Sequence, residues 1–225
     1  MENRVTLYSY YRSTAAYRVR IALASKGIDY EYKSVRGLRQ GDEAFTCEYL
    51  KANPQGLVPF LIDGDLQIAQ SLAIMEYLDE TRPASPLLPR GPGPRAFVRS
   101  VAQYIASDIH PLNVMRVRKL LTKMGYGDDD KRAWYEHWLH IGFTALEGML
   151  RNSPVRGKCC YGDEPTIADM CLVPQAYNAT RFGFSLEAFP GVRGVRDYCE
   201  GLPAFAKAHP DGQPDRSEYS PLDEY

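Results

Sequence analysis

The sequence predicts an α/β plus all-α protein, with a small α/β domain followed by an all-helical domain. In about the first 80 residues, apolar positions alternate between the two-residue period of strands and the 3.6-residue period of helices. Residues 82–94 then contain five prolines and two glycines, which excludes a regular helix or central strand there. Beyond them only helical periodicity is visible. We therefore expect domains at 1–82 and 95–213, a linker at 83–94 and a polar tail at 214–225.

The first domain alternates strands and helices in an order that suits a thioredoxin-like fold. The order is βαβ followed by ββα, with a tight turn at Asp63-Gly64-Asp65 between the last two strands. Pro59 lies at the start of a predicted strand, where a trans proline would disturb the ladder, so it is a candidate cis-proline. Gly27 follows the first helix at the position of a left-handed cap. The expected strands are 4–9, 30–35, 57–62 and 67–69, and the expected helices are 14–26, 43–52 and 71–81.

The second domain is predicted from helical spacing alone. Within the helix expected at 131–151, five apolar residues share one stripe, which indicates a core-facing surface. Thr166 and Asp169 are spaced as the N-cap and N3 residues of a capping box, and Pro174 is expected to kink the helix that follows. The expected helices are 96–124, 131–151, 170–177, 192–200 and 203–208, and the stripe comprises Trp134, Trp138, Ile141, Ala145 and Met149.

The composition indicates an ordinary globular protein of the cytoplasm. With 225 residues and a formal net charge of −1, the chain lacks the basic excess that drives binding to nucleic acid or anionic membranes. We see no signal-peptide pattern and no apolar segment near the roughly 20 residues of a membrane span. The five cysteines form no C-x-x-C pair, which favours reduced, buried thiols over a disulfide frame. Four histidines without ligand spacing give no metal signal.

The start of the first predicted helix carries two hydroxyl side chains. Ser13 and Thr14 lie where the first-turn N–H groups and the positive end of the helix dipole favour an anion. A free thiol has a pKa of about 8.5, and a helix start with hydroxyl donors lowers that pKa toward neutrality. Such an arrangement is able to stabilise a bound thiolate. Simple N-capping by Ser13 is the alternative.

Residues 11–23 resemble the signature of the zeta-class glutathione transferases, the maleylacetoacetate isomerases. That signature has a Ser-Ser-Cys triplet before a Trp- or His-Arg-Val-Arg-Ile-Ala-Leu run. This chain has Ser13-Thr14-Ala15, with Ala15 in place of the family cysteine, and continues with Tyr17-Arg18-Val19-Arg20-Ile21-Ala22-Leu23. The resemblance extends over about residues 3–213. It implies the cytosolic glutathione transferase architecture, with glutathione as cofactor bound at Ser13.

The resemblance also implies that further motifs hold glutathione. In the family, the residue before a cis-proline exchanges main-chain hydrogen bonds with the cysteine of glutathione, and the matching pair here is Val58-Pro59. Gln70-Ser71 matches the family pair that binds the γ-glutamyl end together with helix-start N–H groups. Residues 108–113 resemble a bacterial segment that reaches glutathione, which makes His110 and Asn113 candidates. A core histidine is the alternative for His110.

A dianionic maleyl substrate, and a cationic wall to receive it, are further implications of the resemblance. Arg12 flanks the thiolate site, and Arg181 matches an arginine of the family segment Val-Pro-Gln-x-x-x-Ala-x-Arg-Phe. Bacterial relatives usually have Asn-x-Arg-Val where this chain has Val-Met-Arg-Val, so Arg116 is retained and the asparagine is lost. Solvated surface is the alternative for each arginine. Catalytic roles are expected for Ser13, Thr14 and Arg12.

The implied function is glutathione-dependent cis–trans isomerisation of maleylacetoacetate or maleylpyruvate, in aromatic amino-acid catabolism, by a cytoplasmic homodimer. The thiolate adds to the cis double bond, the resulting single bond rotates, and elimination returns glutathione and the fumaryl isomer. Two alternatives stay open: a glutathione-conjugating or dehalogenating transferase, and a non-catalytic binding protein, for which Ala15 leaves room. Thiol–disulfide exchange is disfavoured because Ser13 occupies the position of the attacking sulfur.

Overall fold

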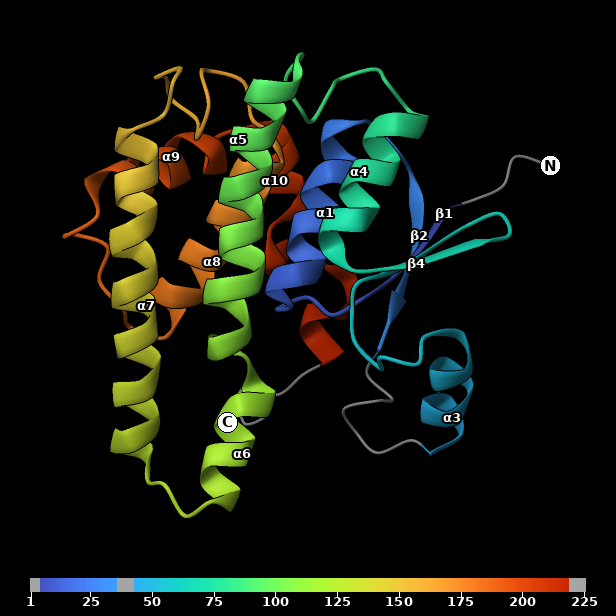
Figure 1. Cartoon of the computed structure of the whole chain (residues 1–225). Helices are drawn as coiled ribbons and strands as arrows, with labels where there is room; N and C mark the ends of the chain where they lie inside the picture. Colours follow the sequence, from blue (N-terminus) through green and yellow to red (C-terminus); the bar gives the residue numbers. More distant parts are fainter. Residues whose placement is uncertain (1–4, 36–42, 219–225) are drawn as a thin grey trace. The chain divides into compact units, whose positions relative to one another are not determined.

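The chain divides into two compact units in the computed structural model, which describes residues 5–35 and 43–218. The first unit comprises the residues up to Leu87 together with those from Leu202 onward, and the second comprises Leu88–Gly201. The first unit is α/β and the second is helical (Figure 1), so the predicted fold class is confirmed. Among the described residues, no helix has the length and apolar character needed to span a membrane.

A four-stranded mixed sheet forms the centre of the first unit, in the order β2-β1-β3-β4. β1 (Val5–Ser9) pairs in parallel with β2 (Tyr30–Ser34), and it pairs antiparallel with β3 (Phe60–Asp63). β3 in turn pairs antiparallel with β4 (Leu66–Ala69) through a tight turn in which Gly64 has a φ of 62°. This topology is the thioredoxin-like arrangement that the order of elements predicts.

Among the described residues before the linker, three helices accompany this sheet: α1 (Thr14–Ser25), α3 (Glu43–Ala52) and α4 (Ser71–Thr81). α1 and α4 pack against each other (Figure 1), and both bury aliphatic side chains completely. Each such side chain contributes about 1.5–3 kcal/mol relative to an exposed one. α1 ends before Gly27, whose φ of 64° confirms the predicted left-handed cap.

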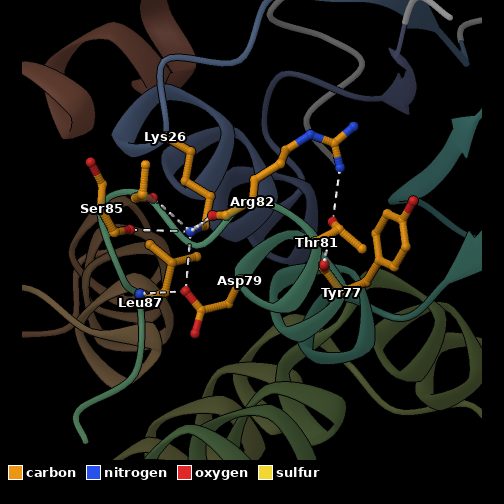
Figure 2. Close-up of polar contacts among 8 residues, drawn as sticks. Lys26, Tyr77, Asp79, Thr81, Arg82, Ser85 and Leu87 are labelled. Atoms are coloured by element: carbon orange, nitrogen blue, oxygen red, sulfur yellow. Dashed lines mark hydrogen bonds and ion pairs between the residues drawn. The ribbon is translucent and has the colours of Figure 1, made fainter.

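A buried polar cluster ties the C-terminal end of α1 to the start of the linker (Figure 2). Lys26 Nζ forms an ion pair with Asp79 Oδ1 at 3.1 Å, and these side chains are only 1% and 7% exposed. Removing either partner would leave a buried charge, a change that costs about 3–5 kcal/mol. Lys26 Nζ also donates to three backbone carbonyl oxygens, those of Arg82 at 2.7 Å, Ala84 at 3.2 Å and Ser85 at 3.1 Å.

The linker is shorter than predicted, because α5 (Pro92–Gln103) already begins at Pro92. Pro92 and Pro94 fall in the first turn, where the helix needs no backbone N–H donor and the fixed φ of proline fits. The abundance of proline excludes a helix interior, but it does not exclude a helix start.

The long helix expected at 96–124 is interrupted around Pro111. After α5 the chain continues as a π-helical segment, η1 (Tyr104–Ile109), and a 3-10 segment, η2 (His110–Asn113). A new helix, α6 (Met115–Lys123), follows. Proline lacks the N–H that would continue the hydrogen-bond ladder and its ring clashes with the preceding turn, which explains the break.

The predicted core stripe of α7 (Asp128–Arg151) is wrong. Ile141 is 46% exposed and Ala145 is exposed as well. A Cβ added at Gly142 would meet Ile109 at 2.8 Å, so η1 approaches α7 closely at this glycine. Because glycine adds nothing to a hydrophobic pattern, the spacing of apolar residues did not indicate the face of α7 that contains Gly142. It indicated a neighbouring face of the helix instead. The buried residues of α7 are Tyr135, Leu139, Gly142, Phe143 and Leu146.

The capping box at the start of α8 (Ile167–Arg181) is confirmed. Thr166 Oγ1 accepts from the Ala168 N–H at 3.3 Å, and Asp169 Oδ2 accepts from the Thr166 N–H at 2.8 Å. The helix is longer than predicted at both ends and contains Pro174. α9 (Pro190–Glu200) completes the second unit.

Residues 203–218 pack with the first unit, in contrast to the expected helical domain to 213 and polar tail from 214. α10 (Pro203–Ala208) packs against α1, and two 3-10 segments, η3 (Pro210–Gly212) and η4 (Pro214–Glu218), follow it. Asp215 in η4 is completely buried. Phe205 and Ala208 bury apolar surface, and Asp215 adds polar contacts that hydropathy does not detect. Residues 219–225 of the expected tail lie outside the described residues.

Candidate functional site

Ser13 is the N-cap residue of α1, so the capping alternative is correct as local structure. Its Oγ accepts a hydrogen bond from the Ala16 N–H at 3.2 Å. The hydroxyl proton of Ser13 meets no acceptor among the described residues, so it can be donated to an external anion at the helix start. Thr14 is buried whereas Ser13 is half-buried, which makes Ser13 the more accessible hydroxyl.

Arg12 lies beside this helix start and is held by aromatic side chains. Its Nε donates to the Tyr10 hydroxyl at 2.9 Å, and its guanidinium lies 5.0 Å from the centroid of the Tyr11 ring. A guanidinium over a ring face is stabilised by the ring quadrupole. A half-buried cation is therefore fixed next to Ser13 in the chain.

The loop before β3 contains a cis peptide bond between Val58 and Pro59, as predicted. β3 begins only at Phe60, so the N–H and C=O groups of Val58 join neither sheet ladder. They are available to an extended peptide, in the manner of an added strand.

The carbonyl group just before Val58 is fixed by two donors that are not among the predicted site residues. The Tyr49 hydroxyl and the Asn53 Nδ2 group both donate to Leu57 O, each at 2.7 Å. Burial raises the pKa of Tyr49 to about 12, so this hydroxyl keeps its proton at neutral pH. The signal that could have revealed Asn53 is its place before Pro-Gln-Gly, since asparagine often organises such a turn.

Gln70 and Ser71 form an uncapped start to α4. Gln70 has a φ of 73°, an uncommon conformation for a residue other than glycine, and no side chain caps the helix. The Gln70 Nε2 group donates to Gln55 Oε1 at 2.8 Å. Open first-turn N–H groups bind carboxylates well, so this start fits the γ-glutamyl end of glutathione.

The remaining predicted residues belong to the second unit. In η2, His110 is half-buried, and the buried Asn113 donates through Nδ2 to Ile109 O at 2.9 Å. Arg116 is exposed on α6, and Arg181 is the last residue of α8. Contact of these four side chains with a ligand stays a prediction.

The ring of Phe182 is contacted by two guanidinium groups. Arg181 lies 4.8 Å and Arg118 5.1 Å from the centroid of this ring, and Tyr135 packs against its edge. Burial raises the pKa of Tyr135, and the two arginines act in the opposite direction. Arg118, two residues after the predicted Arg116, is thus the α6 arginine that shares an aromatic ring with Arg181. Residues two apart in a helix lie on different faces, so Arg116 and Arg118 point in different directions from α6.

Four of the five cysteines are buried, whereas Cys47 is exposed, so the expectation of buried thiols is wrong at Cys47. The ligand atoms of Cys159, Asp169 and Cys199 lie within 4.8 Å of one another, close enough to hold a metal ion. Asp169, however, already accepts from the N–H groups of Cys160 and Thr166, at 2.7 and 2.8 Å. Burial raises the pKa of Asp169. These contacts favour a structural role, and the absence of a metal stays a prediction.

A hollow of about 440 Å³ in the second unit is separate from every predicted site residue. It is lined by parts of α7 and α9 and the loop between residues 153 and 159. Glu147 lies on its wall and accepts from the N–H groups of Gly191 and Val192, at 2.8 and 3.0 Å, so the start of α9 is already capped. The hollow therefore has no part in the candidate site.

Comparisons with known proteins agree with these features. The family model for the N-terminal domain of glutathione S-transferases matches residues 3–80. A probable maleylacetoacetate isomerase of Vibrio cholerae is 47% identical over 210 residues, which is 93% of this chain and 97% of that protein. The maleylacetoacetate isomerase of Mus musculus is 45% identical over 93% of this chain and 94% of its own length.

Solved structures show the same relationship. A bacterial maleyl pyruvate isomerase, described as a zeta-class glutathione S-transferase in holo form, has 40% identity and a TM-score of 0.87, covering 93% of this chain and 99% of its own. A maleylacetoacetate isomerase of Anaeromyxobacter dehalogenans with glutathione in its active site has 40% identity and a TM-score of 0.83, covering 95% of this chain and 98% of its own. The chain therefore belongs to the maleylacetoacetate isomerase family of zeta-class glutathione transferases.

Proposed function

We propose that this protein is a glutathione-dependent cis–trans isomerase of maleylacetoacetate or maleylpyruvate. The observation that carries the proposal is the start of α1, where Ser13 caps the helix and keeps a hydroxyl proton to donate. The relatives named maleylacetoacetate isomerase, at 45–47% identity over 93% of the chain, supply the reaction class.

Three elements of the first unit fit the three parts of glutathione. Ser13 and the first-turn N–H groups of α1 would hold the thiolate, because a helix start stabilises an anion. The open peptide groups of Val58 would pair with the cysteine backbone. Gln70 and the uncapped start of α4 at Ser71 would receive the γ-glutamyl carboxylate and ammonium groups.

Bound glutathione supplies a thiolate that adds reversibly to the cis double bond and so permits rotation about it. Ser13 keeps the sulfur ionised by donating a hydrogen bond, and the helix dipole adds to this effect. Thr14, buried directly after Ser13, supports the turn. Arg12 offers a cation near the carbonyl oxygen of the substrate, where negative charge develops.

The second unit is proposed to supply the cationic wall for a dianionic maleyl substrate. Arg181 is the main candidate because arginine can bind a carboxylate with two parallel hydrogen bonds. Arg116 is a second candidate, and His110 and Asn113 are proposed to reach glutathione. These roles are supported by the match of their sequence segments to the family pattern.

We also propose a homodimer that acts in the cytoplasm, in aromatic amino-acid catabolism. The assembly and the pathway are inferred from the family. The five free cysteines agree with a reducing compartment, where glutathione is kept as the thiol.

The test is an absorbance assay of maleylacetoacetate and maleylpyruvate isomerisation, with and without glutathione. We expect turnover that requires glutathione in catalytic amounts, with total thiol constant over many turnovers. Loss of one thiol per turnover would instead favour the conjugating or dehalogenating transferase. No turnover despite glutathione binding would favour the non-catalytic binding protein, for which the replacement of the family cysteine by Ala15 leaves room.

A further inference from the structure

Residues 203–218, here called the C-terminal segment, reach the loop that leads to Ser13. After α10, the Gln213 Nε2 group donates to the carbonyl oxygens of Lys207 and His209, at 3.2 and 2.9 Å, and so folds the segment back. This places Asp215 in the first unit, 204 residues along the chain from its hydrogen-bond partner Tyr11.

Asp215 is completely buried, and its carboxylate accepts hydrogen bonds from three groups of the sheet end and loop. Oδ2 accepts from the Tyr11 N–H at 3.2 Å and the Ser34 hydroxyl at 3.4 Å, and Oδ1 accepts from the Tyr32 hydroxyl at 2.7 Å. Burial raises the pKa of Asp215, while the hydrogen bonds from Tyr32 and Tyr11 and the charge of Arg20 act in the opposite direction. Burial of an ionised carboxylate is costly unless hydrogen bonds and an opposite charge replace the lost hydration. The three donors and the charge of Arg20 meet this requirement at Asp215.

Arg20 binds the carbonyl groups that lie before and after the Tyr11 N–H in the chain. Its Nη2 donates to Tyr11 O at 2.8 Å, and its Nη1 donates to Tyr10 O at 3.3 Å. Its Nε donates to Ala208 O at 3.1 Å, so the same guanidinium also contacts the C-terminal segment. The Tyr11 residue therefore has its N–H bonded to a buried anion and its C=O bonded to a buried cation.

Tyr10 and Tyr11 lead directly into the thiolate site. The Ser13 N–H donates to Tyr10 O at 2.9 Å, so the position of the N-cap depends on this loop. Tyr11 itself is 2% exposed, and the guanidiniums of Arg12 and Arg216 both lie near its ring, at 5.0 and 5.5 Å from the centroid. Displacement of the Tyr11 peptide would therefore move both Ser13 and Arg12.

We propose that Asp215 is a positioning residue, which holds the Tyr11 peptide from the C-terminal segment and so fixes Ser13 at the thiolate site. The C-terminal segment is thus part of the glutathione-binding unit. The inference rests on the proposed function, because it assigns to Ser13 the donation of a hydrogen bond to the bound thiolate.

The test compares D215N with D211N in the full chain. D211N is the matched control, since Asp211 belongs to the same segment but has a side chain that is 66% exposed. The thiol pKa of bound glutathione is measured from the ultraviolet absorbance of the thiolate against pH. We expect D215N to raise this pKa by about one unit and to lower kcat about 10- to 100-fold. KM for the maleyl substrate should stay nearly unchanged, and D211N should match the wild type.

A double variant shows whether Asp215 acts through Ser13. If it does, S13A/D215N should have the thiol pKa of S13A alone, because the two changes remove the same interaction. Additive shifts would overturn the proposal, as would a folded D215N with the thiol pKa and kcat of D211N.

If D215N does not fold, Y32F/S34A removes two of the donors to Asp215 and should raise the thiol pKa. An unchanged value there would also overturn the proposal.

Glutathione binding and the thiol pKa of the wild type distinguish a failure of this inference from a failure of the proposed function. Failure of the wild type to bind glutathione or to lower its thiol pKa would contradict the proposed function. A wild type that lowers the thiol pKa, together with a D215N variant that lowers it equally, would contradict only the role of Asp215.

Discussion

Arg18 Nη1 donates a hydrogen bond to Ser71 Oγ at 3.2 Å, and both side chains are buried. Arg18 lies in α1, which carries Ser13 at its start, and Ser71 is the first residue of α4. The two helix starts are proposed to hold opposite ends of glutathione. This bond therefore helps to fix the distance between the thiol position and the γ-glutamyl position within one unit.

The substitution S71A should weaken both stability and glutathione binding. It leaves a buried guanidinium N–H without its acceptor, which costs about 1–3 kcal/mol of unfolding free energy. Urea denaturation and calorimetric titration with glutathione measure the two effects. S100A is the control, because the Ser100 hydroxyl donates to Phe97 O within an exposed part of α5. Unchanged glutathione affinity in S71A would show that Ser71 has no part in binding.

The substitution S13A should lower kcat by about 10- to 1000-fold, the scale expected when one donor to a developing anion is lost. The thiol pKa of bound glutathione should rise at the same time. Loss of the N-cap should cost about 0.5–2 kcal/mol of unfolding free energy, which urea denaturation measures separately. T14A should have a milder effect on kcat, since Thr14 is buried. A larger effect of T14A would move the donor role to Thr14.

Replacement of all five cysteines should leave most of the activity. Ala15 stands where the family has its cysteine, and the four buried thiols lie in the second unit. Turnover of the cysteine-free variant is the measurement. A large loss, reproduced by alkylation of the wild type at one cysteine, would contradict the assignment of thiolate stabilisation to Ser13.

The substitution R181A should lower kcat/KM for the dianionic maleyl substrate by about 2–4 kcal/mol in transition-state free energy. R181K should not restore the loss, because lysine cannot offer two parallel hydrogen bonds to a carboxylate. Affinity for glutathione should stay nearly unchanged. A neutral electrophile, such as a chlorinated nitrobenzene, is the control substrate. Equal damage to both reactions would assign Arg181 a structural role beside Phe182.

Ionisation of Tyr49 should destabilise the protein at alkaline pH. Burial raises its pKa in the folded state to about 12, above the unfolded value of about 10. Its contribution to stability is therefore complete below pH ~10 and is lost as pH rises through the folded pKa, by about 2–3 kcal/mol in total. The difference in unfolding free energy between the wild type and Y49F should shrink over that interval. A constant difference would contradict the pKa shift.

Local signals account for much of what could be predicted from the sequence. The bounds of α4 match the prediction, and the left-handed Gly27, the cis-proline before β3 and the Thr166 capping box are confirmed. Each depends on residues close together in the chain, where backbone sterics and capping decide the conformation. The Ser13 motif belongs to the same class, because an N-cap and the three residues after it define a helix start by themselves.

The sequence by itself therefore determined the fold class, the positions of Ser13 and Gln70 at the starts of their helices, and the cis-proline that follows Val58. Only the tertiary structure decided which face of α7 is buried, that Leu57 O is held by Tyr49 and Asn53, and that Arg18 meets Ser71. It also brought Asp215 onto the Tyr11 peptide. Polar contacts between distant residues leave no periodicity in the chain, because their energy arises from burial, and burial exists only once the chain has folded.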